Sequence, residues 1–244
     1  MTNTSIFKPV AILLLSSAAI PALSGCQQNT PEIVTEKNEP LATKPTLCAD
    51  LGEAAFNDRG QANCALGSND GSGLILEVRY GAPRDGDEYG AVEVEIKAVL
   101  PYDDVKLTIK ETSEFVYGLP TVQDLDGDGR NELLVPLMTG NVNTVYALWR
   151  GVTSPQPYTR VGEISGVSFE AMDDGMFSAS ARASAASWVT SYYKFIDGDI
   201  SNIATAMVEL PDSDAGVETC TVSDDGGLAH IGLTLPQAQD KFCG

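Results

Sequence analysis

The sequence predicts an all-β fold, because short segments with strand periodicity follow one another along most of the chain. Residues 91–97 and 105–110 alternate strictly between apolar and polar side chains, which places the apolar ones on a single face of each strand. Turn sequences rich in Gly, Asp, Pro and Ser separate such segments at a spacing of roughly ten residues. This pattern is typical of a sandwich, a barrel or a propeller.

Further strands are expected where β-branched, aromatic and aliphatic residues form short runs between these turns. These segments are Leu74–Tyr80, Phe115–Val122, Leu133–Met138, Thr144–Arg150, Met176–Arg182, Trp188–Phe195 and Ile200–Leu210. A short helix is expected near each end of the domain, over Ala49–Phe56 and over Thr234–Phe242. Thr234 and Gln237 have the spacing of a capping box, which favours a helix start there.

The N-terminus predicts export. Residues 1–25 have the layout of a secretory signal peptide, with an apolar run over 10–20 that is too short to span a membrane. The segment Leu23–Cys26 resembles a bacterial lipobox, which implies cleavage before Cys26 and a lipid anchor on its thiol; an ordinary signal peptide is the alternative. Residues 26–46 are polar and contain three prolines, as in a flexible tether, and residues 47–244 are expected to form a single domain. By similarity to enterobacterial sorting, Gln27 favours the periplasmic side of the outer membrane over the inner membrane.

The cysteine count fits that compartment. Five cysteines are odd for an exported chain, and acylation of Cys26 leaves four: Cys48, Cys64, Cys220 and Cys243. Disulfides are expected in an oxidising periplasm, and three pairings are open, of which the local one joins Cys48 to Cys64 and Cys220 to Cys243. A zinc site is the rival, but the chain has no Cys-x-x-Cys and a single histidine, His230.

The charge limits the partners. The chain has 15 basic and 34 acidic residues, for a formal net charge of −19. A surface this acidic repels phosphate backbones and anionic lipid, so nucleic-acid binding is excluded. The same charge attracts divalent cations and would steer a basic protein partner, although solubility alone explains it equally well.

Residues 124–132, Asp-Leu-Asp-Gly-Asp-Gly-Arg-Asn-Glu, have the composition of a loop that binds a hard cation. Calcium takes six to eight oxygen ligands, and carboxylates two positions apart converge only if the backbone curls tightly. Gly127 and Gly129 permit that curl because glycine tolerates positive φ. The predicted Ca²⁺ ligands are the side chains of Asp124, Asp126, Asp128 and Glu132 and the carbonyl of Arg130. The alternative is a solvated Asp/Gly turn.

The loop is not an EF-hand. That motif requires a bidentate Glu at its twelfth position between two helices, whereas the twelfth position here is Val135 and the flanks have the pattern of strands. A strand–loop–strand with Asp-x-Asp-Gly-Asp-Gly-x-x-Glu resembles the calcium loops of FG-GAP and VCBS-type repeats. This resemblance implies a propeller-like fold with integrin-type blades, with a β-sandwich as the second choice.

The sequence does not assemble a hydrolase or a nucleotide site. It contains no Gly-x-Ser-x-Gly, no glycine-rich phosphate loop and no histidine besides His230, so we expect a protein that is not an enzyme. Adjacent acids at 103–104, 173–174 and 224–225 leave a glycosidase pair open, although such pairs usually mark solvated turns. Two roles are open to the aromatic residues of these strands: contact with a sugar or protein, or packing in the core, which their strand periodicity favours. The residues are Tyr146, Trp149, Trp188, Tyr192 and Tyr193.

The order of segments from Tyr117 to Leu210 carries a second resemblance. A calcium loop leads into a strand (124–136), followed by residues 143–149, 158–164, a Ser/Ala-rich strand (177–187) and residues 192–200. This order resembles the calcium-binding periplasmic lipoproteins that act as immunity proteins against lysozyme-like effectors of bacterial secretion systems. The resemblance implies a propeller-like protein that blocks the active site of a cell-wall hydrolase.

The functional expectation is therefore a non-catalytic, lipid-anchored, calcium-binding module whose partner is a basic cell-wall hydrolase effector. Two alternatives stay open. One is a lipoprotein that binds or hydrolyses cell-wall glycan, and the other is an envelope scaffold with structural calcium only.

Overall fold

The computed structural model describes residues 45–86, 90–100, 105–114, 117–153, 156–211 and 217–244. Contacts divide the chain into two compact units, Met1–Thr43 and Lys44–Gly244, and the described residues all belong to the second. The predicted signal peptide (1–25), the lipidated Cys26 and the tether up to residue 44 lie outside the described residues. Within the described part, no helix combines the length and apolar character needed to span a membrane.

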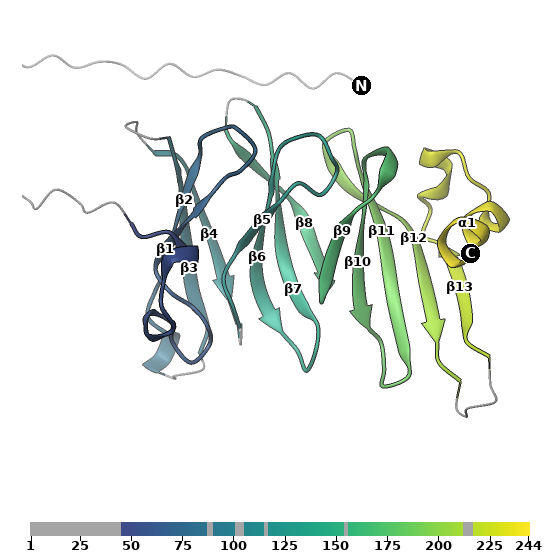
Figure 1. Cartoon of the computed structure of the whole chain (residues 1–244), viewed down its shortest axis with the longest axis horizontal. Helices are drawn as coiled ribbons and strands as arrows, with labels where there is room; N and C mark the ends of the chain where they lie inside the picture. The colour runs from purple at the N-terminus through teal and green to yellow at the C-terminus, as the bar shows by residue number, and fades with distance from the viewer. Residues whose placement is uncertain (1–44, 87–89, 101–104, 115–116, 154–155, 212–216) are drawn as a thin grey trace, which may run out of the picture. The chain divides into compact units, whose positions relative to one another are not determined.

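Three antiparallel sheets, formed by strands in chain order, make up most of this unit (Figure 1). The first sheet contains β1 (Cys64–Gly67), β2 (Ile75–Tyr80), β3 (Val92–Val99) and β4 (Val105–Ser113). The middle sheet contains β5 (Thr121–Gln123), β6 (Glu132–Thr139), β7 (Thr144–Gly151) and β8 (Tyr158–Gly166). The last sheet contains β9 (Ser168–Ala171), β10 (Met176–Arg182), β11 (Ser187–Ile196), β12 (Asp199–Glu209) and β13 (Thr219–Asp224).

Short helical turns and one α-helix complete the unit. The 3₁₀ turns are η1 (Cys48–Asp50), η2 (Glu53–Ala55), η3 (Arg84–Gly86), η4 (Asp173–Gly175) and η5 (Leu228–Ile231). Helix α1 spans Leu235–Cys243, and the N–H of Thr234 donates to Gln237 Oε1 at 2.9 Å, as a capping box requires.

The sheets pack on one another through three apolar layers. Leu76, Val78 and Ile96 of the first sheet meet Leu133 and Val135 of the middle sheet. The opposite face of the middle sheet, with Leu134, Leu148 and Ile164, packs on Phe177 of the last sheet. Met176 and Ile203 then pack on the other side of the last sheet with Ala238 of α1.

The burial of the sheets explains their sequence patterns. Strand β3 has one face on the core and alternates along its length, with Val92, Val94 and Ile96 buried. The outer face of the first sheet carries ion pairs, such as Lys97 with Glu95 at 3.2 Å. Strand β6 is covered on both sides and is buried continuously over residues 132–136. Pro136 is tolerated inside β6 because the register shifts between Pro136 and Met138.

The all-β prediction is confirmed. The choice between a propeller-like fold and a β-sandwich stays a prediction. The described strands close neither a barrel nor a ring of blades, so a sandwich describes these stacked sheets as well as a propeller does. The helix predicted over Ala49–Phe56 is wrong, because Leu51 and Gly52 are extended and separate two 3₁₀ turns. Of the strand predicted over Phe115–Val122, residues 115–116 lie outside the described residues, and β5 begins only at Thr121, since Gly118 has a φ of 93° and Pro120 follows. Strands β1, β8, β9 and β13 are not in the predicted set.

Both disulfides join residues that are near in sequence. Cys48 of η1 is bonded to Cys64 of β1, and Cys220 of β13 is bonded to Cys243 of α1. This is the local pairing of the three that four cysteines allow, and the second bond holds α1 against the edge of the last sheet. Two disulfides fit a protein of an oxidising compartment such as the periplasm.

Candidate metal centre

The residues predicted to bind calcium form the connection between β5 and β6, which we call the aspartate loop (residues 124–132). Leu125 is fully buried and packs in the layer between the middle and last sheets, so it anchors the loop to the core. Gly127 and Gly129 have φ angles of 73° and 86°, the left-handed conformation that the predicted curl requires. The loop is therefore a fixed turn held by the core at its start.

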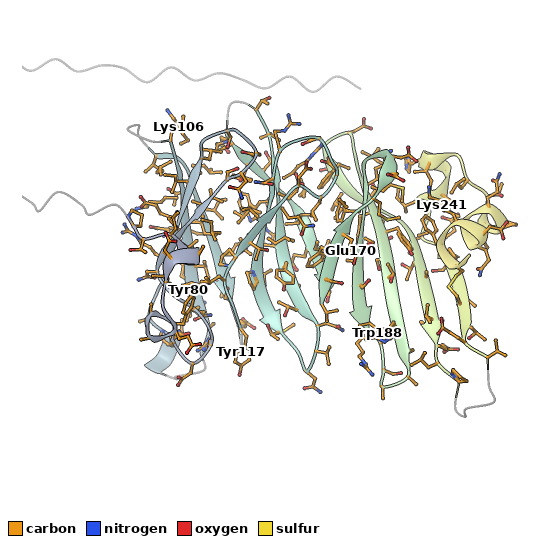
Figure 2. The ribbon with its side chains drawn as sticks, viewed as in Figure 1. Tyr80, Lys106, Tyr117, Glu170, Trp188 and Lys241 are labelled. Atoms are coloured by element: carbon orange, nitrogen blue, oxygen red, sulfur yellow. A yellow bond between two sulfur atoms is a disulfide. The ribbon has the colours of Figure 1, made fainter. Side chains whose placement is uncertain are left out.

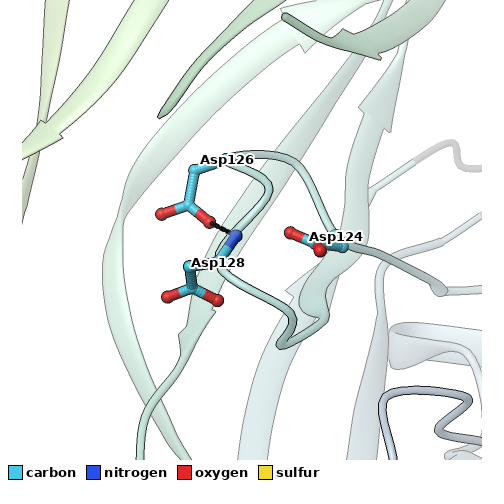
Figure 3. Close-up of side chains that lie close together, drawn as sticks. All are labelled: Asp124, Asp126 and Asp128. Atoms are coloured by element: carbon cyan, nitrogen blue, oxygen red, sulfur yellow. Dashed lines mark hydrogen bonds between the residues drawn. The ribbon is translucent and has the colours of Figure 1, made fainter. Parts of the chain in front are cut away.

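Three carboxylates converge within this turn (Figure 3). One oxygen from each of Asp124, Asp126 and Asp128 lies within 4.8 Å of the others. Asp124 accepts the N–H groups of Gly127 at 2.8 Å and Gly129 at 3.0 Å, so its carboxylate closes the curl. Burial, together with the neighbouring charge of Asp128, raises the pKa of Asp126 above its usual range.

Two arginines offset part of this negative charge. Arg150 of β7 donates from Nη2 to Asp126 Oδ2 at 3.0 Å and lies 3.5 Å from Asp128 Oδ2. Its guanidinium also lies over the Phe195 ring of the last sheet, 4.4 Å from the centroid. The guanidinium of Arg130 pairs with Asp128, and its Nε donates to the carbonyl of Gly151 at 3.3 Å.

Glu132 closes the loop from inside the core. It is fully buried, and its Oε2 accepts the N–H of Leu125 at 2.9 Å. Its Oε1 is also buried and accepts no hydrogen bond of good geometry among the described residues, although the nearby N–H of Gly151 opposes part of the rise in its pKa. Burial raises the pKa of Glu132 to about 7, and the charges of Asp126 and Asp128 add to the rise. A buried carboxylate oxygen without a partner is costly unless a cation or donor compensates it.

These residues fit a hard divalent cation. Four carboxylates and two guanidinium groups leave a formal charge of −2 on the aspartate loop and its arginines. Calcium prefers oxygen ligands, and the converging aspartates supply them from a turn of fixed shape. Glu132 is not within the group of three whose oxygens lie close together, and its free Oε1 is the feature that fits it to a cation.

A second loop, which the sequence does not predict to be part of the site, contacts the aspartate loop. Asp70, between β1 and β2, accepts the N–H of Asn131 at 3.2 Å, and the amide of Asn131 donates to Ser68 Oγ at 3.2 Å. Burial opposes ionisation of Asp70, but hydrogen bonds from Ser68, Ser72 and Asn131 outweigh it and lower its pKa to about 2. The pairing joins two sheets, so no local pattern could have shown it.

A cavity of about 510 Å³ lies beside this junction. Its lining includes the polar side chains of Asp70, Arg130 and Asn131 and the apolar groups of Leu74, Val152 and Tyr158. The cavity combines apolar walls with a few polar groups, a composition common in small-molecule sites.

The other residues singled out from the sequence have local structural contacts. Asp224 accepts the N–H of Gly226, and Asp225 accepts the hydroxyl of Thr205 and the amide of Asn202. The carbonyl of Asp174 accepts Lys194 Nζ at 2.6 Å in a groove that His230 also lines. Residues 103–104 lie outside the described residues.

The aromatic residues divide between core and surface. Tyr146 and Tyr193 pack in the layer between the middle and last sheets, and Tyr192 stacks on Phe242 of α1 with ring centroids 4.0 Å apart. Trp149 donates from Nε1 to Glu111 at 2.9 Å. Trp188 lies near one end of the last sheet (Figure 2).

Comparisons with known proteins show little. No protein-family model matches the chain, and no curated protein gives a significant match. Among solved structures the chain is similar to one described as "Structure of a Xanthomonas Type IV Secretion System related protein", with 11% sequence identity and a TM-score of 0.47. The alignment covers 70% of this chain and 95% of that chain. Similarity at this level carries no argument about function, so the resemblances to FG-GAP repeats and immunity lipoproteins rest on the sequence alone.

Proposed function

We propose that this chain is a calcium-stabilised β protein of the bacterial envelope. The observation that carries this proposal is the aspartate loop, in which three carboxylates converge and a buried Glu132, bonded to the N–H of Leu125, keeps one oxygen without a well-formed hydrogen bond. The ligands would be Asp124, Asp126 and Asp128, with Glu132 and the Arg130 carbonyl completing the set. Calcium would neutralise the net negative charge of this loop and hold the β5–β6 connection in one conformation.

We propose more narrowly that it is a lipid-anchored, periplasmic binding module that inhibits a peptidoglycan hydrolase. The lipobox-like segment ending in Cys26 supports the anchor, and Gln27 supports the outer membrane. The two disulfides support an oxidising compartment. The propeller-like fold and the immunity role are supported by the sequence order around the aspartate loop.

The charge supports a basic partner. A net charge of −19 would raise the association rate with a basic enzyme such as a lysozyme-like hydrolase, and salt would weaken this effect. Inhibition requires no catalytic group in this chain, only a surface that covers the substrate cleft of the enzyme.

Clearance of peptidoglycan by basic lysozyme-like hydrolases tests this function. The soluble chain from residue 27 onward is added in calcium, with heat-unfolded protein as the control. We expect the folded protein to slow clearance in proportion to its concentration. Unchanged clearance at a saturating concentration, across hydrolases of this class, contradicts the inhibitor role.

The cavity beside the aspartate loop favours one second candidate, a protein that binds cell-wall glycan. It predicts that the protein alone is retained on peptidoglycan and that soluble muropeptides displace it. Retention without any effect on a hydrolase would favour this candidate over the inhibitor.

A further inference from the structure

A largely apolar surface with an acidic rim lies at the end of the sheets opposite the aspartate loop. We call it the hairpin face and define it by Tyr117, Met138, Val142, Trp188, Leu210 and Val217. Five of these are exposed beyond a third of their area: Tyr117 58%, Met138 48%, Val142 51%, Leu210 43% and Val217 82%. Figure 2 places Tyr117 and Trp188 at this same end of the sheets.

Contacts show that the hairpin face is continuous across two sheets. The N–H of Tyr117 donates to Thr139 Oγ1 at 3.4 Å, so Tyr117 lies beside the β6–β7 hairpin. Asn143 of that hairpin exchanges two hydrogen bonds with Arg182, at 2.9 and 2.8 Å, which joins it to the β10–β11 hairpin. The N–H of Leu210 donates to the carbonyl of Ala186 at 2.8 Å and continues the surface to β12.

Two shallow grooves lie along the hairpin face. One, of about 360 Å³, lies between residues 140–143 and residues 182–185. The other, of about 370 Å³, lies between Ser184 and the pair Leu210 and Val217. The hairpin face therefore has relief into which side chains of a partner can insert.

The charge distribution separates the hairpin face from the rest of the chain. Neither hairpin, 140–143 or 183–186, contains a charged residue, although charged residues make up 20% of the chain. Arg182 is the cation in the grooves, and it is held internally by the carbonyls of Ser184 and Ala185 and by the Trp188 ring. The rim carries Glu114, Glu209 and Glu218, which form no ion pair within the described part of the chain.

This composition matches the buried centre of a protein interface. Such centres are depleted of Lys, Glu and Asp and enriched in aromatic residues, Met and Arg, and their rims are polar. Tyr117, Met138, Arg182 and Trp188 supply the enriched types, and the three glutamates supply the rim.

We infer that the hairpin face docks a protein partner with a basic rim around an apolar centre. The free charges of the face are all negative, so complementarity requires positive charge on the partner. A second copy is disfavoured because two chains of net charge −19 repel each other. An anionic membrane is disfavoured for the same reason. The inference deepens the proposed function, since it assigns the surface with which an inhibitor would contact its hydrolase.

Site-specific photocrosslinking tests the inference in cells that make the full chain. A benzoylphenylalanine replaces Val142 in one strain and Val105 in another. Val105 is the matched control, because it is a valine that is 48% exposed at the opposite end of the sheets, at the start of β4. We expect an adduct at position 142 only, to a protein that mass spectrometry identifies as basic.

The identity of the adduct separates the two proposals. A basic hydrolase captured at 142 supports both, and a basic protein without hydrolase activity supports the hairpin face and contradicts the inhibitor role. A hydrolase captured only at 105 overturns the hairpin face and leaves the inhibitor role standing. No adduct, an adduct to a second copy or an adduct to lipid at 142 overturns the inference.

Affinity gives a second measurement once the captured protein is purified. Val142→Asn places an amide with no partner in an apolar contact, so we expect at least tenfold weaker binding. Val105→Asn makes the same change at the other end, and binding within twofold of the unaltered chain is expected. Equal affinities for the two variants would overturn the hairpin face.

Discussion

The two ends of the middle sheet differ in what holds them in shape. The aspartate loop is fixed by buried groups, with Leu125 in the core and the buried Glu132 accepting the N–H of Leu125. The hairpin face is held by hydrogen bonds between surface loops, such as those of Asn143 with Arg182, and five of its six large side chains are exposed. The difference indicates that the aspartate loop contributes to the stability of the fold and the hairpin face to partner binding. Substitutions at one end should therefore leave the property of the other end unchanged.

The largest difference is expected from truncating one apolar residue at each end. Leu125→Ala removes a side chain that is 0% exposed, and such truncations cost about 2–5 kcal/mol. For a domain of this size we expect the melting temperature to fall by roughly 5–15 °C. Val142→Ala changes a half-exposed side chain and should stay within about 0.5 kcal/mol. Calorimetry of both variants checks this, and equal losses would contradict the division.

Calcium is expected to give the next largest effect, and only through the aspartate loop. A cation that binds only the folded state adds about 2.7 kcal/mol at a hundredfold excess over Kd. The melting temperature should therefore rise by roughly 5–10 °C between EDTA and calcium. Asp126→Ala should abolish the rise, whereas Val142→Ala should retain it. A melting temperature that is indifferent to calcium contradicts the proposed site.

Glu132→Gln is expected to raise stability in the absence of calcium and to reduce the stabilisation that calcium adds. In EDTA above pH 7, where Glu132 is ionised, the neutral amide removes a buried charge whose Oε1 lacks a well-formed hydrogen bond, so the variant should be more stable by about 1–2 kcal/mol. In calcium the variant lacks one carboxylate ligand, so its gain should be smaller than that of the wild type. Melting curves in the two buffers measure both effects.

The control for Glu132→Gln is Glu170→Gln, which makes the same change at an exposed position on β9. It should leave both melting temperatures within error of the wild type. A Glu132→Gln protein that is less stable in EDTA would show that the ionised carboxylate is needed for folding itself.

The sequence predicts the parts of the fold that have a local cause. The alternation in residues 91–97 yields β3, and the two glycines of the aspartate loop take the expected φ angles. Strand β13 has only two apolar residues, Cys220 and Val222, which make its apolar pattern short, and β9 has only four residues. These strands form because a neighbouring strand pairs with them, which local propensity does not encode.

The candidate site also combines features that the local sequence predicts with features that depend on the fold. Its carboxylates lie within nine residues, so the sequence predicts them. Arg150 lies 24 positions from Asp126, and Asp70 lies 61 positions from Asn131, so both contacts depend on how the strands stack. The unpartnered Oε1 of Glu132 depends on burial, which the sequence does not give for a single glutamate.

The smallest expected effect concerns the loop that pairs with the aspartate loop. The pKa of Asp70 is lowered to about 2 from 3.8, so its ionised form stabilises the folded state above pH 4, and this contribution is lost as the pH falls toward 2. Asp70→Asn should cost about 1 kcal/mol at pH 6 and almost nothing near pH 2. Urea unfolding across this range measures the difference, with Asp240→Asn on α1 as the exposed control. A cost that stays constant with pH would mean that packing, rather than the charge, joins the two loops.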